Sequence, residues 1–146
     1  MNMVNDKIYI TYSEEETFQV GEEIASQWNS PVIVLLQGEL GAGKTVLTRG
    51  FCSGLGLEDL SLVHSPTFSL VNQYETPSGL LFHIDLYRLD SSKEQYSIGL
   101  DEILGDSGFV VIEWPEKLRI PISKFLLIDF KVQDDDSREL SLKSRA

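Results

Sequence analysis

The chain has 146 residues, of which 42% are hydrophobic, and a formal net charge of −11 at pH 7. This length predicts one domain, residues 1–146, large enough to bury a layered core. The apolar residues fall in short runs, none near the ~20 residues that cross a bilayer, so we expect no membrane contact. The acidic excess argues against autonomous nucleic-acid binding, because that affinity comes mainly from Lys and Arg neutralising phosphates.

The expected compartment is the cytoplasm. The first residues lack the basic and then apolar progression of a signal peptide. The single cysteine, Cys52, cannot form an internal disulfide, which fits a reducing environment. We therefore expect a soluble cytoplasmic protein.

The first quarter of the chain predicts a strand, a helix and a second strand. Residues 7–11 form a short strand-like run. Ser13, followed three residues later by Glu16, forms a capping box that begins a helix. The apolar, β-branched run at 32–36 then predicts a buried strand.

A complete phosphate-binding loop follows that second strand. Its sequence is Gly38-Glu39-Leu40-Gly41-Ala42-Gly43-Lys44-Thr45. Its three glycines let successive backbone N–H groups turn toward an anion, and the helix that begins here directs its positive end to the same place. Lys44 adds a charge toward the β- and γ-phosphates, and Thr45 presents a hydroxyl to Mg²⁺. The loop therefore predicts binding of a nucleoside triphosphate together with Mg²⁺.

The rest of the chain alternates strands and helices. The expected elements are a hairpin formed by 67–74 and 80–84, helical stretches through Glu94 and at 100–104, and strands at 109–112, 125–128 and about 139–142. Such alternation around a phosphate loop predicts an α/β fold. We expect a single P-loop NTPase domain with a central, mostly parallel sheet, helices on both faces and a β-hairpin insertion.

Two acids are candidates for the metal and water chemistry of a triphosphatase. Asp85 follows the apolar run 80–84, and Glu113 follows the apolar run 109–112. Parallel sheets place ligand groups at the carboxyl ends of their strands, and Mg²⁺ needs a carboxylate there besides Thr45. Either acid alone has the simpler reading of an ordinary residue at the end of a strand.

Two further residues have two readings each, and a third has one favoured reading. Trp114 either covers the nucleotide or packs against the sheet. Thr67 is either a switch residue that senses the γ-phosphate or a threonine that begins a strand. His83 alternates with the apolar residues of its strand, which favours a structural histidine.

Four motifs together resemble the TsaE family, formerly called YjeE. They are the loop Gly38–Thr45, Ser65-Pro66-Thr67-Phe68, His83-Ile84-Asp85-Leu86-Tyr87-Arg88 and Ile112-Glu113-Trp114-Pro115-Glu116-Lys117. Many proteins share the phosphate loop, whereas the motifs after it are specific. Their order and spacing match the family from Ser13 to about Lys117.

The resemblance implies a small bacterial ATPase that assists the TsaD–TsaB heterodimer. That heterodimer places threonylcarbamoyl on the adenosine next to the anticodon of ANN-decoding tRNAs, and the transfer chemistry belongs to TsaD. In proteins similar to this one, ATP binding promotes assembly with the heterodimer and hydrolysis resets the complex. We therefore expect weak ATP hydrolysis by the chain alone and stimulation by its partners.

The resemblance also implies roles by position. It gives phosphate binding to Lys44, Mg²⁺ coordination to Thr45 and Glu113, a place near the nucleotide to Ser13, organisation of metal or water to Asp85 and the switch to Thr67. Arg88 contacts either a phosphate or the partner, and the sequence leaves both open.

Three other functions share the phosphate loop. A small-molecule P-loop kinase usually carries several arginines in a lid, whereas Arg49, Arg88 and Arg119 are dispersed along this chain. A GTPase would need an N-K-x-D or T-K-x-D element, which the sequence lacks. A nucleotide-gated binding module with negligible hydrolysis overlaps with the first interpretation, because switches with incomplete sites need a partner to complete them.

Overall fold

The computed structural model describes residues 6–27, 30–39, 41–66, 70–105 and 108–145. Its strands are β1 (Lys7–Thr11), β2 (Ile33–Gln37), β3 (Val71–Thr76), β4 (Gly79–Asp85), β5 (Phe109–Glu113), β6 (Phe125–Val132) and β7 (Arg138–Arg145). Its helices are α1 (Glu14–Ser26), α2 (Lys44–Gly54), α3 (Ser92–Ser97) and α4 (Leu100–Gly105), with short 3-10 helices η1 (Leu60–Leu62) and η2 (Pro115–Lys117). The expected strands and helices are therefore present, with β6 and β7 longer than the sequence indicated.

The strands form one mixed sheet in the order β1-β7-β6-β2-β5-β4-β3. The four central strands, β6, β2, β5 and β4, are parallel neighbours, whereas β1, β7 and β3 join antiparallel. The expectation of a mostly parallel sheet therefore holds only for its centre. The predicted hairpin exists as β3 and β4, but it is no insertion: β4 is itself a central strand, because it pairs in parallel with β5.

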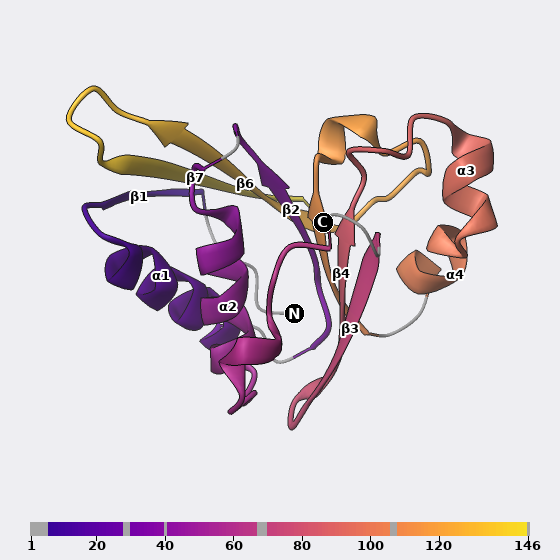
Figure 1. Ribbon diagram of the computed structural model, residues 1–146, viewed down its shortest axis with the longest axis horizontal. Coiled ribbons are helices and arrows are strands. Elements are labelled where there is room, and N and C mark those ends of the chain that lie inside the picture. Colours follow the sequence, from indigo (N-terminus) through magenta and orange to yellow (C-terminus); the bar gives the residue numbers. More distant parts are fainter. Residues whose placement is uncertain (1–5, 28–29, 40, 67–69, 106–107, 146) are drawn as a thin grey trace.

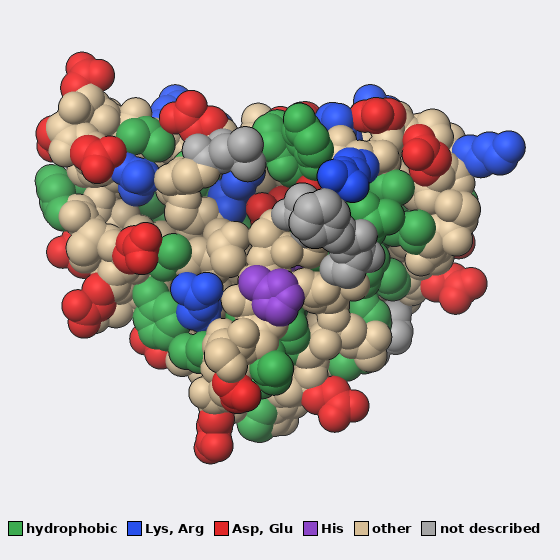
Figure 2. All heavy atoms as spheres, viewed as in Figure 1, with side chains coloured by type: hydrophobic (Ala, Val, Ile, Leu, Met, Phe, Trp, Pro, Cys, Tyr) green, Lys and Arg blue, Asp and Glu red, His purple; other side chains and the backbone are tan. Residues whose placement is uncertain are grey.

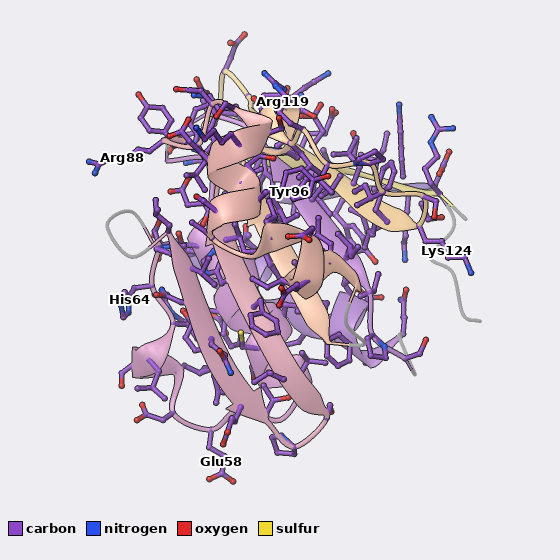
Figure 3. All side chains as sticks on the ribbon, turned by 90° about the vertical axis from the view of Figure 1, so that its right-hand side faces the viewer. Glu58, His64, Arg88, Tyr96, Arg119 and Lys124 are labelled. Atoms are coloured by element: carbon purple, nitrogen blue, oxygen red, sulfur yellow. The ribbon has the colours of Figure 1, made fainter. Side chains whose placement is uncertain are left out.

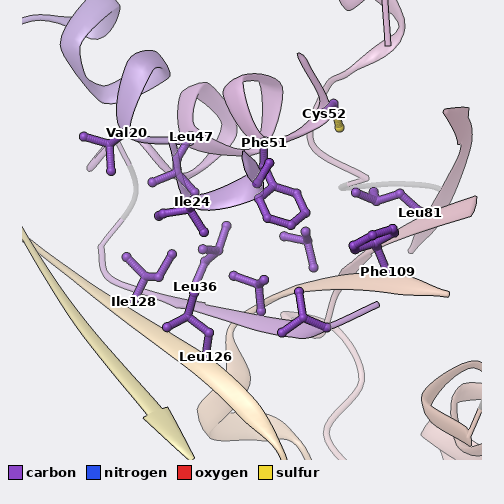
Figure 4. Packing of buried hydrophobic residues seen from close by; sticks show 14 of the residues in the cluster. Val20, Ile24, Leu36, Leu47, Phe51, Cys52, Leu81, Phe109, Leu126 and Ile128 are labelled. Carbon is purple, nitrogen blue, oxygen red and sulfur yellow. The ribbon is translucent and has the colours of Figure 1, made fainter. Parts of the chain in front are cut away.

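Helices cover both faces of the sheet, as expected. α1 and α2 lie side by side on one face, and α3 and α4 lie against the other at the β4 side (Figure 1). Two apolar clusters fill these layers. Figure 4 shows the larger one, in which Ile24 and Phe51 from the helices pack on Leu36, Leu126 and Ile128 of the sheet. The alternating pattern of each central strand thus supplies both layers of core.

The two helices on the first face approach each other through glycines. A Cβ at Gly50 of α2 would overlap the carbonyl oxygen of Phe18, and a Cβ at Gly21 of α1 would overlap that of Leu47. The helix backbones are therefore in direct contact. This contact fixes α2, and with it the start of that helix, against the rest of the domain.

The predicted capping box begins α1. The Ser13 hydroxyl oxygen accepts from the Glu16 backbone N–H at 3.1 Å. The Glu16 carboxylate accepts in return from the N–H of Tyr12 at 2.8 Å, one residue earlier than the usual partner. None of the helices in the described ranges is long and apolar enough to cross a membrane.

Candidate functional site

The phosphate loop connects the end of β2 to the start of α2. Gly38, Gly41 and Gly43 have φ angles of 155°, 79° and 107°, a region that side chains with a Cβ rarely adopt. Gly43 is the residue that precedes α2, and no side chain caps this helix end. The backbone N–H groups of the first helical turn are thus left for a ligand, which is the arrangement that binds anions.

Lys44 is the first residue of α2, and it is almost completely buried. Its ammonium group donates to the carbonyl oxygen of Gly38 at 2.7 Å and lies 4.6 Å from the centre of the Trp114 ring. Thr45 follows it in the first turn and is half-buried. The lysine is therefore held at the mouth of the loop by the strand end on one side and an indole on the other.

The two predicted acids meet at the carboxyl edge of the sheet. Asp85 ends β4, Glu113 ends β5, and the two residues are register partners. Glu113 is also the register partner of Leu36, two residues before Gly38 of the loop. Both carboxylates are buried, with 7% and 5% of their residue surfaces exposed. The structure therefore brings both acids beside the start of the phosphate loop.

The surroundings of Asp85 disfavour the ionised form of its carboxyl group. Burial raises its pKa above the ordinary value, and the neighbouring Glu113 raises it further. The backbone N–H of Tyr87 donates to Asp85 Oδ1 at 2.9 Å, which works in the opposite direction, as do His83 and Lys44. A cation at this edge would offset the unfavourable charge.

His83 belongs to this cluster, although its sequence pattern indicated a structural residue. It is completely buried, and its Nε2 lies 2.7 Å from Oε2 of Glu113. The signal available in the sequence was its position two residues before Asp85, which places both side chains on one face of β4. The pairing with Glu113 depends on strand register, which the sequence alone does not reveal.

Aromatic and charged side chains form a wall beside the acids. The rings of Trp114 and Tyr87 are 5.0 Å apart between centres. The ammonium nitrogen of Lys117 lies 5.0 Å from the centre of the Tyr87 ring and 2.8 Å from Oδ1 of Asp90. Trp114 is partly buried and packs on the smaller apolar cluster, which lies on the face of the sheet that α3 and α4 cover. Its packing role is therefore confirmed, while its ring also faces Lys44.

A second buried polar residue, Gln95 of α3, was also missed. Its amide nitrogen donates to the carbonyl oxygens of Leu89 at 2.9 Å and Lys117 at 2.7 Å, and its oxygen accepts from the N–H of Arg119 at 2.9 Å. These bonds tie the segment after β4 to the segment after β5. Gln95 thus fixes the two connections that follow the candidate acids.

A pocket of about 240 Å³ lies on the other side of the phosphate loop. Its lining comes from the β1–α1 connection, the loop and the β6–β7 turn: Thr11, Tyr12, Ser13, Glu14, Thr17, Gly41, Ala42, Gly43, Val46, Asp136 and Arg138. Arg138 donates to the carbonyl oxygen of Gly41 at 3.3 Å. Ser13 therefore lines the same pocket as Gly41 and Gly43 of the loop, and its place near a nucleotide stays a prediction.

Not every predicted site residue can be placed. Leu40 and Thr67 lie outside the described residues. Glu39 is exposed, and its carbonyl oxygen accepts from the N–H of Ala42 within the loop. Arg88 points outward at the margin of the molecule (Figure 3), and Arg119 is exposed.

The residues present suit a nucleotide-bound Mg²⁺ better than a metal held by protein alone. Within the described ranges, no three His, Cys, Asp or Glu side chains are grouped to hold a metal ion. Mg²⁺ is usually bound by one or two carboxylates together with substrate phosphates and water. Asp85, Glu113 and the Thr45 hydroxyl are oxygen ligands of that kind, and they lie beside a phosphate loop.

Charges on the surface are interspersed. Figure 2 shows Lys and Arg side chains standing singly on this face, with acidic side chains chiefly toward its periphery. No continuous basic patch is visible on the face shown. This distribution agrees with the net charge of −11.

The chain matches known proteins along most of its length. The family model described as threonylcarbamoyl adenosine biosynthesis protein TsaE matches residues 11–140. A protein named tRNA threonylcarbamoyladenosine biosynthesis protein TsaE from Aquifex aeolicus is 37% identical over 136 residues, which cover 93% of this chain and 95% of that protein. A protein of the same name from Rickettsia bellii is 38% identical over 139 residues, 94% of each chain.

A solved structure agrees with the sequence matches. The crystal structure of Bacillus subtilis YdiB superimposes with a TM-score of 0.76 at 29% identity, over 100% of this chain and 90% of that one. The family takes part in the biosynthesis of threonylcarbamoyladenosine in tRNA. Because the family model matches residues 11–140 and both relatives match more than nine tenths of this chain, the chain belongs to the TsaE family.

Proposed function

We propose that the chain binds ATP with Mg²⁺ and hydrolyses it as an accessory protein of threonylcarbamoyl modification of tRNA. The observation that carries this proposal is the convergence of Lys44, Asp85 and Glu113 at one edge of the sheet, next to a glycine-rich loop that leads into a helix. This is the constellation that a P-loop ATPase uses. Membership of the TsaE family supports it.

The phosphates bind to the loop and to the first turn of α2. The N–H groups of Gly41, Gly43, Lys44 and Thr45 supply hydrogen-bond donors, and Lys44 supplies charge toward the β- and γ-phosphates. In the structure the Lys44 ammonium contacts the Gly38 carbonyl oxygen and the Trp114 ring. In the proposed complex it turns toward a phosphate.

The acids and Thr45 form the Mg²⁺ side of the site. Bound Mg²⁺ neutralises charge that develops on the transferred phosphoryl group. Thr45 and Glu113 supply oxygen ligands, and Asp85 supplies a ligand or orients the attacking water. Because the Asp85 carboxyl is buried with a raised pKa, it is suited to either task only when a cation or a proton offsets its charge.

The pocket beside the loop suits the nucleoside. It adjoins Gly41 and Gly43, so a nucleotide whose phosphates occupy the loop extends its base toward Ser13, Asp136 and Arg138. Side-chain donors and acceptors at the rim suit a purine edge. In this arrangement Trp114 and Asp85 lie at the opposite end of the nucleotide, next to its γ-phosphate.

The partner that we propose is the TsaD–TsaB heterodimer, with the chain acting as a nucleotide-gated switch in the cytoplasm. The proposed division of labour leaves tRNA contact and acyl transfer to the heterodimer. Two properties of this chain support it: its net charge of −11 and the interspersed charges on the face shown in Figure 2. An acidic factor needs no affinity for tRNA to control a partner that binds it.

Calorimetric titration tests the nucleotide assignment. We expect ATP to bind with Mg²⁺, GTP to bind more weakly, and Lys44→Ala to abolish binding. Lys124→Ala is the matched control, because Lys124 is exposed. It lines a separate pocket with Leu104 and Pro121, and that lining includes no residue of the phosphate loop. Equal ATP affinity in the wild type and Lys44→Ala would remove the assignment of the site.

A further inference from the structure

His83 is placed deep in the domain, yet it contacts a residue of the candidate site. It has no exposed surface. Its register partner on β5 is Val111, and Glu113 lies two residues further along that strand. Side chains two residues apart on a strand share a face, so the imidazole and the Glu113 carboxylate lie on the same side of adjacent strands.

The contact between them has a defined direction. Nε2 of His83 lies 2.7 Å from Oε2 of Glu113. A carboxylate that binds Mg²⁺ only accepts hydrogen bonds, so for Glu113 to act as a metal ligand the imidazole must donate from Nε2–H. A donor on Oε2 restricts rotation of the carboxylate and leaves Oε1 outside this bond. The imidazole thus fixes one of the two oxygens of Glu113 and leaves the other for a further partner.

The other nitrogen of the ring argues against a role in core packing alone. Nδ1 is buried, and among the described residues it has no hydrogen-bond partner. An unpaired buried polar atom costs about 1–3 kcal/mol, a cost that an apolar side chain at this position would avoid. In the part of the chain that the structure describes, the ring's hydrogen bond is the one with Glu113. The histidine is therefore better explained by what it does to that carboxylate.

We propose that His83 is a positioning residue that orients the Glu113 carboxylate toward the Mg²⁺ of the nucleotide site. This inference depends on the proposed function, because it gives Glu113 a metal to bind. Carboxylates that bind metals are commonly held by hydrogen bonds of their own, and loss of such a partner weakens metal binding by about 10–100-fold. His83 touches neither nucleotide nor metal in this scheme and acts through Glu113.

The test compares two amide replacements that differ in reach. In His83→Gln the amide nitrogen extends to about the position of Nε2, whereas in His83→Asn it extends only to about that of Nδ1. The dissociation constant of ATP is measured by calorimetry in excess Mg²⁺ and in EDTA. The constant in EDTA divided by the constant in Mg²⁺ gives the contribution of Mg²⁺ to binding. We expect His83→Gln to keep the wild-type ratio within about threefold and His83→Asn to lower it about tenfold or more.

The affinity in EDTA separates positioning from general damage. We expect it to be unchanged in both variants, because the contacts of His83 are with Glu113 and Tyr74 and none is with a described residue of the phosphate loop. A wild-type ratio in His83→Asn would overturn the inference. So would an equal loss of ATP affinity with and without Mg²⁺, since that result indicates a merely structural residue.

A measurement on the metal-free wild type keeps the inference testable if the variants do not fold. Long-range ¹H–¹⁵N correlation spectra distinguish the two neutral tautomers of a histidine ring. We expect the proton of His83 on Nε2, and a spectrum with the proton on Nδ1 would contradict the inference. Absence of any Mg²⁺-dependent ATP binding by the wild type would instead refute the proposed function, independently of the ring.

Discussion

The ammonium nitrogen of Lys44 lies 4.6 Å from the centre of the Trp114 ring, so the loop lysine is in contact with the residue after Glu113. Trp114 has φ 61° and ψ 52°, a left-handed conformation that directs the chain into η2. Its ring contacts Tyr87 on another side. A change at the phosphate loop can therefore reach the exposed segment after β4 through two ring contacts.

We predict that ATP binding changes the fluorescence of Trp114. Binding draws the Lys44 ammonium toward a phosphate and removes a positive charge from the face of the indole. The chain has two tryptophans, so the measurement is made in a Trp28→Phe background. Titration with ATP and Mg²⁺ should shift the emission, and Lys44→Met without nucleotide should shift it as well. An emission spectrum indifferent to both changes would show that the contact is not altered by binding.

We predict that Asp85→Asn stabilises the ligand-free protein at neutral pH. Burial raises the pKa of Asp85, so the folded protein holds that proton more tightly than the unfolded chain does. The charged form therefore costs stability at pH 7, and this cost disappears as the pH falls through the raised pKa. Asparagine removes the charge and keeps an acceptor for the Tyr87 N–H. The gain should be about 0.5–2 kcal/mol, as is common when strain at a functional site is removed.

Urea denaturation in EDTA measures this gain at several pH values. It should shrink between pH 7 and the ordinary pKa of aspartate, about 3.9, because the wild-type carboxyl becomes neutral in that window. The same variant should bind ATP with a smaller contribution from Mg²⁺. A variant less stable than the wild type at pH 7, or a gain independent of pH, would contradict the burial argument.

We predict that Gly50→Ala destabilises the domain, although alanine is favoured over glycine inside helices by about 1 kcal/mol. A Cβ at Gly50 would overlap the Phe18 carbonyl oxygen, so α1 and α2 must separate. Overpacking of this kind costs about 1–3 kcal/mol. The control is Gly105→Ala at the end of α4, where a Cβ meets no atom within 4 Å.

Thermal denaturation of the two variants provides the comparison. Gly50→Ala should melt well below the wild type and also bind ATP more weakly, because α2 begins with the phosphate loop. Gly105→Ala should leave both properties nearly unchanged. Equal melting temperatures for the two variants would show that the helices can accommodate a methyl group between them.

The phosphate loop and the two strand-end acids were predictable because their chemistry is local. Gly38 to Thr45 specify their own backbone conformation, and Asp85 and Glu113 each end an apolar run that must be a buried strand. Parallel neighbours then bring those ends together. The sequence could thus place the acids at one edge without knowing which strands are adjacent.

Features that depend on register or on distant parts of the chain were not predictable in this way. The His83–Glu113 contact requires β4 and β5 to be neighbours in one particular register. The mixed character of the sheet has the same origin, because β1 pairs with β7, which lies at the opposite end of the sequence. Gln95 has partners from two separate connections, and none of them is marked by a local motif.

The central claim is that this chain is an ATPase whose turnover is completed by its partners. The most direct test measures ATP hydrolysis with Mg²⁺ by the purified chain, alone and with TsaD–TsaB from the same organism. We predict slow turnover alone and clear stimulation by the heterodimer, with Glu113→Ala impaired under both conditions. Rapid turnover that is indifferent to the heterodimer would contradict the account and indicate an enzyme with a substrate of its own.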